Sequence, residues 1–196
     1  MADLSNICNF GWKALDFALE GTDGKIYRLS DLRGKNGTLV IFLSNTCPYV
    51  RAVISRIVEE AAALKQIGIG VVGIMSNYGD PRDSLDSMRE FVRQHALPFP
   101  YVEDPTQEVA RAYDAQCTPD FFGFNAKDEL QYRGRLDASR RELIPGVRRD
   151  LFEAMKQIAE TGAGPREQIP SMGCGIKWKP QPEAPHEDSS LAPPSL

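Results

Sequence analysis

The feature that most constrains this chain is a cysteine placed between an apolar run and a helical pattern. Residues 38–43 are mostly apolar and β-branched or aromatic, which is typical of a buried parallel strand. The polar triplet Ser44-Asn45-Thr46 separates this run from Cys47. Beyond it, apolar residues recur at the spacing of one helix face: Val50, Val53, Ile54, Ile57, Val58, Ala61 and Leu64. The cysteine therefore stands where a buried strand ends and a helix begins.

This position favours the reactive form of Cys47. The unpaired N–H groups and the positive dipole at the start of a helix stabilise an anion, and the thiolate is the nucleophilic form of cysteine. Pro48 fits the first helical turn, because its missing N–H costs nothing there. Arg51 lies one turn further on, where its charge can stabilise a thiolate, although surface arginines are more often simply solvated. The alternative reading of Cys47 is an inert buried cysteine, which is common in proteins.

The remaining patterns alternate between strands and helices. A hairpin is expected between residues 17 and 29. The later elements are expected to be a helix at 48–68, a strand at 69–75, a helix at 81–95, an extended segment at 98–102, a short helix at 106–113, a strand hairpin at 120–124 and 130–135, and a helix at 147–161. This order predicts an α/β fold with a mixed central sheet and helices on both faces. Asp83, Asp86 and Glu90 are expected on a solvated helical face.

The chain divides into a globular part and an extension. At 196 residues it is long enough for one well-buried domain with an appendage. We assign residues 1–162 to the domain, because a Gly- and Pro-containing segment ends the last helix there, and residues 163–196 to a C-terminal extension. Prolines, serines and acidic residues dominate after about residue 180, so we expect that part to be mobile.

Charge, hydropathy and cysteine spacing argue against several classes of function. A net charge of −4 disfavours nucleic acid and anionic membranes as partners, and no apolar run approaches the length of a membrane span. The first residues lack the basic segment and apolar core of a secretory signal, so we expect a cytoplasmic protein with reduced thiols. The cysteines, Cys8, Cys47, Cys117 and Cys174, are widely spaced without Cys/His clusters, so we expect no metal site and no other cofactor.

Four sequence blocks, together with the element order, carry a resemblance to a known family. They are Cys47-Pro-Tyr-Val50, Cys117-Thr-Pro-Asp-Phe-Phe-Gly-Phe124, Tyr132-Arg-Gly-Arg-Leu-Asp137 and Ile169-Pro-Ser-Met-Gly-Cys174-Gly-Ile-Lys-Trp178. On these blocks the chain, up to about residue 179, resembles the AhpC/TSA-type, peroxiredoxin-like proteins of the thioredoxin fold. The resemblance implies a thioredoxin-like fold and a thiol-dependent oxidoreductase that uses Cys47. It also implies that the peptide bond between Thr118 and Pro119 is cis and faces the sulfur of Cys47.

The chain departs from the related patterns at several positions. Thioredoxins carry a second cysteine three residues after the first, where this chain has Val50. Peroxiredoxins carry a proline where this chain has Val40, whereas Ser44 matches their hydroxyl position. Their arginine before the strand that follows the third helix is also missing, with Thr118 and Pro119 in that region. A dithiol cycle within one helical turn is therefore excluded, and peroxide chemistry lacks two of its usual groups.

Two other cysteines are candidates for the thiol that resolves an oxidised Cys47. Cys117 is the first candidate, because it adjoins the expected cis-proline and is tied to the start of a core strand. Cys174 is the second, because its Gly-rich segment could swing toward Cys47. It could equally pair with Cys8 or pack in a folded-back tail. Either residue could also be inert packing, and Cys8 is expected to be a bystander.

These residues leave several functions open. As an enzyme, the protein would use Cys47 against a peroxide or a disulfide, and an internal thiol or an external one, such as a thioredoxin-type protein, would restore it. Cys47-Pro48 together with Ser44 is nearer to the peroxiredoxin pattern, which favours the peroxide or general antioxidant version. The alternatives are a non-catalytic binding module on the same fold and a redox sensor whose oxidation rearranges the Cys174 segment. A homodimer is compatible with all of them.

Overall fold

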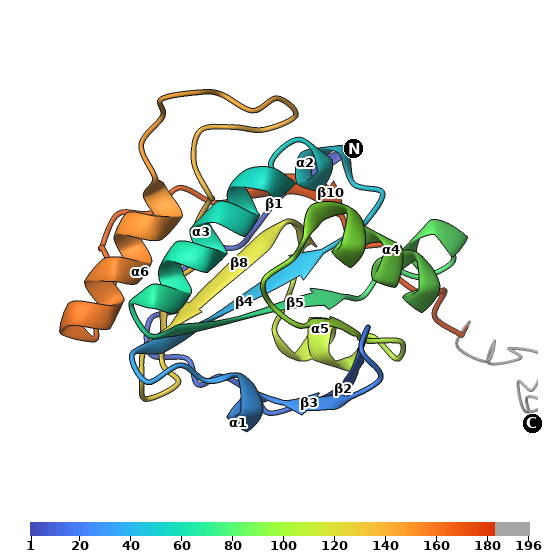
Figure 1. The fold of residues 1–196 in the computed structure, drawn as a ribbon, viewed down its shortest axis with the longest axis horizontal. Coiled ribbons are helices and arrows are strands. Elements are labelled where there is room, and N and C mark those ends of the chain that lie inside the picture. Colours follow the sequence, from blue (N-terminus) through green and yellow to red (C-terminus); the bar gives the residue numbers. More distant parts are fainter. Residues whose placement is uncertain (183–196) are drawn as a thin grey trace, which may run out of the picture.

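The computed structural model describes residues 1–182, and its centre is a seven-stranded sheet in the order β3-β2-β6-β5-β4-β8-β9 (Figure 1). The strands are β2 (Ala18–Gly21), β3 (Ile26–Arg28), β4 (Gly37–Leu43), β5 (Ile69–Met75), β6 (Tyr101–Glu103), β8 (Asp120–Phe124) and β9 (Leu130–Tyr132). β4 pairs in parallel with β5 and antiparallel with β8, so the sheet is mixed, as the sequence predicts. The expected N-terminal hairpin is β2 with β3. The mobility expected for the tail concerns residues 183–196, which lie outside the described residues.

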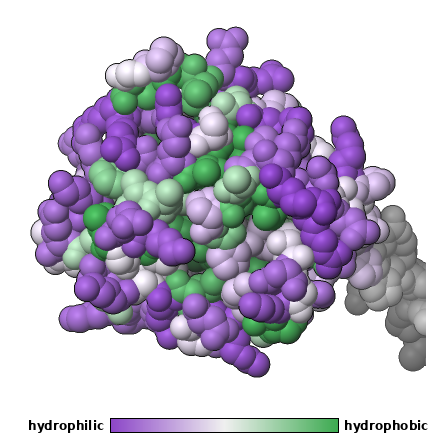
Figure 2. Space-filling view, viewed as in Figure 1, coloured by the Kyte–Doolittle hydropathy of each residue, from purple (hydrophilic) through white to green (hydrophobic). Residues whose placement is uncertain are grey.

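β4 is buried along its whole length, and its side chains alternate between two hydrophobic cores. Leu39, Ile41 and Leu43 belong to the first core, whereas Val40 and Phe42 belong to the second. The first core is covered by α3 (Ile54–Gln66), α4 (Leu85–His95) and α6 (Asp150–Thr161), and the second by α1 (Leu29–Leu32) and α5 (Glu108–Ala112). Helices therefore lie on both faces of the sheet, as predicted. In the view of Figure 1, the molecular surface is mainly hydrophilic with smaller apolar areas (Figure 2).

A second, smaller sheet joins one strand from each end of the described chain to a short strand at residues 117–118. Its order is β1-β10-β7, with bounds Ala2–Leu4, Met172–Gly175 and Cys117–Thr118. β10 belongs to the segment that we assigned to the extension, and it runs antiparallel to both of its neighbours. It also contacts α2 (Pro48–Arg51), and the two elements lie together in Figure 1. The start of the extension is therefore folded against the domain, next to the helix that follows Cys47.

The helix expected at 48–68 is broken into α2 and α3. The N–H of Val53 bonds to the carbonyl of Val50, three residues back, at 3.1 Å. This contact tightens the turn, and α3 begins at the next residue, Ile54. The break lets the short first helix follow the loop that carries Cys47, while α3 packs on the sheet.

The helix expected at 81–95 also begins later than its first proline suggests. Residues Pro81–Asp83 form a separate 3₁₀ turn, η1. α4 starts after Ser84, whose side-chain oxygen accepts a hydrogen bond from the N–H of Ser87 at 3.3 Å, the arrangement of a serine N-cap. No helix within residues 1–182 is both long and apolar enough to cross a membrane.

A buried ion pair joins two of the sequence blocks quoted above. Arg133 Nη2 lies 3.0 Å from Asp120 Oδ2, and the two side chains are 5% and 0% exposed. Asp120 also accepts a hydrogen bond from the N–H of Gln116 at 3.0 Å. Burial raises the pKa of the Asp120 carboxyl, and the charge of Arg133 opposes that shift. Asp120 follows the Thr118–Pro119 peptide and Gln116 precedes it, so these contacts hold the chain on both sides of that peptide.

We predict that Arg133→Met lowers the free energy of unfolding by about 3–5 kcal/mol, because it leaves a buried carboxylate without its counter-charge. Lys156→Met is the control, since its pair with Glu160 is solvent-exposed and spans 3.9 Å; such a pair contributes about 0–1 kcal/mol. Urea unfolding of both variants measures the difference. Equal losses in the two variants would contradict a structural role for the buried pair.

Candidate active site around Cys47

Cys47 lies at the junction that its sequence neighbours predict. β4 ends at Leu43, and Cys47 is the N-cap residue of α2, which begins at Pro48. The carbonyl of Cys47 accepts hydrogen bonds from the N–H groups of Val50 and Arg51 at 3.1 and 2.9 Å. Its side chain is only 3% exposed. The sulfur is thus held at the first helical turn with little of its surface open to solvent.

A cis peptide bond faces this sulfur. The bond between Thr118 and Pro119 is cis, so the geometry implied by the resemblance is confirmed. Cys47 Sγ lies 3.1 Å from the carbonyl oxygen of Thr118, in the position of a thiol that donates to it. The backbone just before β8 therefore forms one wall around the sulfur.

A buried carboxylate organises the loop that precedes Cys47. Asp83 is 2% exposed and accepts hydrogen bonds from Ser44 Oγ at 3.0 Å, the backbone N–H of Asn45 at 2.8 Å and Asn77 Nδ2 at 3.0 Å. The expectation that Asp83 lies on a solvated face is wrong, because η1 places it against the polar donors of this loop. Asp83 therefore positions the loop that delivers Cys47 to the start of α2.

Ser44 and Arg51, both expected to support the sulfur, bond to this same loop. Ser44 Oγ donates to Asp83 and accepts from the N–H of Thr46 at 3.2 Å. Arg51 Nη1 donates to the carbonyl of Asn45 at 3.1 Å. These contacts tie the loop to the first turn of α2. The electrostatic role expected of Arg51 at the thiolate stays a prediction.

Cys174 is a neighbour of Cys47. It lies directly opposite Thr118 in the pairing of β10 with β7, and it packs against the core cluster that contains Cys47. Burial raises the pKa of the Cys174 thiol to about 11, and a negative charge on the neighbouring Cys47 acts in the same direction. The structure therefore brings these two cysteines into the same cluster from distant parts of the sequence.

Gly173 makes the close approach of β10 sterically feasible. A Cβ atom at this position would lie 2.0 Å from the carbonyl oxygen of Thr118 and 2.6 Å from its carbonyl carbon. Any side chain there would push the strand away from the peptide that contacts Cys47. Next to it, Ser171 Oγ donates to the carbonyl of Pro119 at 2.7 Å and holds the strand in place.

Cys117 is buried, and Cys8 is half-buried. Cys117 is fully buried, its Sγ lies 3.6 Å from the carbonyl oxygen of Pro119, and burial and the charge of Asp120 raise the pKa of its thiol. Cys8 packs against the second core, and burial raises its pKa to about 11. Within residues 1–182, no group of three or more His, Cys, Asp or Glu side chains is placed to hold a metal ion.

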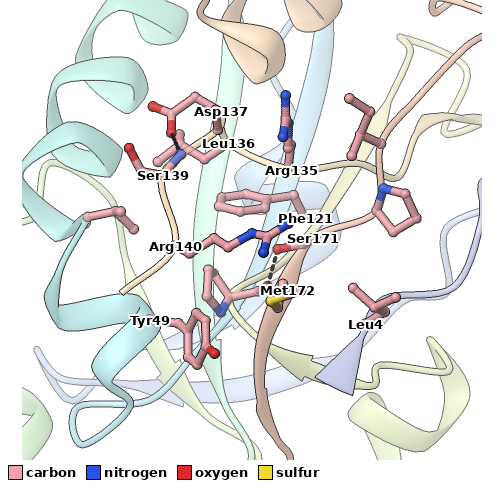
Figure 3. Close-up of a pocket in the computed structure, with 15 residues that line it drawn as sticks. Leu4, Tyr49, Phe121, Arg135, Leu136, Asp137, Ser139, Arg140, Ser171 and Met172 are labelled. Atoms are coloured by element: carbon pink, nitrogen blue, oxygen red, sulfur yellow. Dashed lines mark hydrogen bonds between the residues drawn. The ribbon is translucent and has the colours of Figure 1, made fainter. Parts of the chain in front are cut away.

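A pocket of about 270 Å³ adjoins α2 and the proline of the cis peptide (Figure 3). Tyr49 and Pro119, which follow Cys47 and Thr118 closely in the chain, line one part of it. Arg135 and Arg140 line another part and bring positive charge, and Arg135 Nε is bonded to Asp150 at 2.8 Å. The pocket therefore lies next to the first turn of α2 and to Pro119, although Cys47 itself does not line it.

The sequence pattern of the AhpC/TSA family matches residues 10–133, more than half of the chain. The chain belongs to the AhpC/TSA family. The matched part contains β4, Cys47 and the cis peptide, and it ends before β10. The strand that carries Cys174 therefore lies outside the matched residues.

Similar proteins agree with this assignment. The thiol-disulfide oxidoreductase ResA of Bacillus subtilis (strain 168) is 29% identical over 120 residues, covering 61% of this chain and 64% of ResA, so the chain spans just under two thirds of that relative. The crystal structure of an uncharacterized conserved protein from Geobacillus kaustophilus is 40% identical, with a TM-score of 0.86, and covers 93% of this chain and 98% of that one.

A more distant structure establishes the fold. A thiol:disulfide interchange protein of the thioredoxin family from Chlorobium tepidum TLS superposes with a TM-score of 0.60 at 21% identity, covering 76% of this chain and 97% of that one. The thioredoxin-like fold expected from the sequence is therefore confirmed for this AhpC/TSA-family protein.

Sequence reasoning missed Asp83 and Gly173 as residues of the site. The polar triplet 44–46 was a usable signal for Asp83, because buried polar groups need hydrogen-bonding partners. The Gly-Cys-Gly run around Cys174 was a signal for Gly173, because glycine in a strand often marks the close approach of another backbone. Neither signal identifies the residue that makes the contact. The structure shows that Asp83 bonds to loop 44–46 and that Gly173 adjoins the carbonyl of Thr118.

We predict that Asp83→Ala lowers the free energy of unfolding by about 3 kcal/mol, because it leaves the buried donors of loop 44–46 unpaired. Asp86→Ala is the matched control three residues further on, in the first turn of α4, since the Asp86 side chain is 91% exposed; its effect should stay within about 0.5 kcal/mol. Denaturant titration of both variants is the measurement. If the two losses were similar, Asp83 would not be organising the loop.

Proposed function

We propose that this AhpC/TSA-family protein is a thiol–disulfide oxidoreductase with Cys47 as its nucleophile. The observation that carries the proposal is the position of the Cys47 sulfur, at the start of α2 and 3.1 Å from the carbonyl of Thr118, which precedes a cis-proline. The similarity to ResA, which is a thiol-disulfide oxidoreductase, supports the same reaction class. The substrate is then a disulfide on a protein or a small molecule.

The proposed step is a thiol–disulfide exchange. The thiolate of Cys47 attacks one sulfur of the substrate disulfide, a bond forms between the two sulfurs, and the substrate's own S–S bond breaks. The second substrate sulfur leaves as a thiolate and takes up a proton. The product is a mixed disulfide between Cys47 and the substrate. The pocket lined by Tyr49 and Pro119 is the place from which we expect the substrate to approach.

A peroxide is the competing oxidant, and the contacts of Ser44 favour the disulfide. Ser44 matches the hydroxyl position of peroxiredoxins, but its Oγ donates to the carboxylate of Asp83. Val40, at the position of their proline, is buried in the second core. We therefore consider disulfide exchange the better-supported activity. The sequence pattern alone favours peroxide reduction. A reductant that carries free thiols, such as a thioredoxin-type protein, would close either cycle.

We predict that Cys47→Ser lowers the rate of reaction with 2-hydroxyethyl disulfide by at least about 100-fold, because a serine hydroxyl is far less nucleophilic than a thiolate. Cys8→Ser is the control, since Cys8 packs against the other core and should leave the rate nearly unchanged. Mass spectrometry of the reduced protein, with a parallel incubation in hydrogen peroxide, follows the reaction. An unmodified Cys47 in both incubations would overturn the enzymatic function and favour a binding module.

Alkylation should also distinguish the thiols. Near neutral pH, iodoacetamide should label Cys47 before Cys8 and Cys117, because burial raises the pKa of both of those thiols and the thiolate is the form that reacts. Labelling of Cys8 should increase as the pH rises toward about 11, where its thiol loses its proton. Peptide mass spectrometry at timed intervals gives the order. Labelling of Cys8 ahead of Cys47 would contradict the assignment of the nucleophile.

A further inference from the structure

We propose that Cys174 is the resolving thiol of this site, so that the second cysteine of the redox pair is supplied by β10. This inference rests on the proposed function of Cys47. It extends that function by giving the protein an internal dithiol cycle, even though Val50 occupies the place of the second cysteine in the helix. The substrate would then be released as two free thiols, and the protein would be left with a disulfide between Cys47 and Cys174.

The strand register places Cys174 at the right position. Thr118 contacts Cys47 through its carbonyl oxygen at 3.1 Å, and Cys174 is the residue directly opposite Thr118 on β10. Residues opposite each other in an antiparallel pair have Cβ atoms about 4.5–5.5 Å apart. Cys47 and Cys174 thus meet around the same peptide, and Cys174 packs on the core cluster that includes Cys47.

Cys117 belongs to the other face of the same strand pair. Its partner across the register is Gly175, one position from the Thr118–Cys174 pair. Successive side chains of a strand point to opposite faces, so Cys117 and Cys174 face in opposite directions. The Cys117 sulfur is fully buried, and its hydrogen bond goes to the carbonyl of Pro119. These contacts favour Cys174 over Cys117 as the partner of Cys47.

Cys174 is also held in place before any reaction. On its outer side, β10 pairs with β1, where Ala2 lies opposite Cys174. Ser5 donates its N–H to the carbonyl of Ser171 at 2.8 Å and accepts from the N–H of Ser171 at 2.9 Å. Beyond the strand, the N–H of Lys177 bonds to the side chain of Asn77 at 3.0 Å. Little conformational entropy remains to be lost when Cys174 reacts, which removes the reason for preferring Cys117.

The acidity of Cys174 suits a thiol that acts second. Burial is the main reason that its pKa is raised to about 11, and a negative charge on Cys47 adds to it. Once Cys47 is bound in a mixed disulfide, it carries no negative charge, and this added effect ends. Cys174 then gives up its proton more readily than before, at the stage when its thiolate is needed.

The resolving step balances in atoms and electrons. Cys174 loses its proton, and its thiolate attacks Cys47 Sγ of the mixed disulfide. A bond forms between the two protein sulfurs, the bond from Cys47 to the substrate sulfur breaks, and the substrate leaves as a thiolate that is protonated by water. Two electrons from the two protein thiols have then reduced one substrate disulfide to two thiols. An external dithiol reductant restores the protein by the reverse exchange.

The test is to treat the reduced full-length protein with 2-hydroxyethyl disulfide and to map disulfides by peptide mass spectrometry without reduction. Wild type should form a Cys47–Cys174 disulfide. Cys174→Ser should stop at the mixed disulfide of Cys47 with the reagent, whereas the matched variant Cys117→Ser should still form Cys47–Cys174. A Cys47–Cys117 bond in wild type, or a mixed disulfide that persists in wild type, would overturn the role of Cys174 and leave the nucleophile intact. An unreactive Cys47 would overturn the proposed function itself, and this inference with it.

A backbone variant checks the role of the strand's close approach. Gly173→Ala should slow the step from mixed disulfide to Cys47–Cys174 by at least roughly tenfold, about 1.4 kcal/mol in barrier, because its Cβ would collide with the carbonyl of Thr118. Gly175→Ala is the control, since its Cβ would meet only the flexible end of the Asp3 side chain. The rate of the initial attack by Cys47 is measured in both variants, and the rate of the resolving step relative to it should fall only in Gly173→Ala. An equal rate of resolution in the two variants would overturn the inference, and circular dichroism verifies that both are folded.

Discussion

The complete burial of β4 is the constraint on which the rest of the structure depends. Its backbone groups have no water to bond with, so each edge must pair with another strand, and β5 and β8 do so along most of its length. Its side chains alternate between two hydrophobic cores on opposite faces of the sheet, so helices must cover both faces. The chain can leave this layer only at the end of the strand, and that exit is where Cys47 is placed.

The exit from the sheet is built from polar contacts as much as from apolar packing. Loop 44–46 turns inside the protein, and its donors bond to the carboxylate of Asp83. The side-chain oxygen of Asn45 accepts from the hydroxyl of Tyr101 at 2.9 Å, and burial raises the pKa of that hydroxyl well above its usual range. A buried network of this kind has few alternative arrangements. The sulfur of Cys47 is therefore held at a defined position, although it lies just outside regular structure.

The predictable parts of the fold are those that depend on the pattern of apolar and turn-forming residues within a short stretch of sequence. The β-branched run of β4, the Cys47-Pro48 helix start and the alternation of strands and helices follow from periodicity and turn chemistry. The cis peptide at Pro119 came from resemblance. The position of Asp83 was not predictable from its helical neighbours, because its role depends on a loop far away in the sequence. β10 was missed for a similar reason. A four-residue strand with two glycines, Gly173 and Gly175, has little strand propensity, and only its pairing with β7 makes it a strand.

The three-stranded sheet makes the first residues of the chain part of the environment of the sulfurs. All three residues of β1 are exposed, so backbone hydrogen bonds to β10 contribute more to its attachment than apolar burial does. An outer strand of this kind is the element that opens most easily in local unfolding. Fraying of β1 would uncover one edge of the strand that carries Cys174. In the proposed pair of Cys47 and Cys174, the lifetime of the main-chain hydrogen bonds between β1 and β10 would then govern how firmly Cys174 is held, and a peptide fused ahead of Ala2 would change that lifetime.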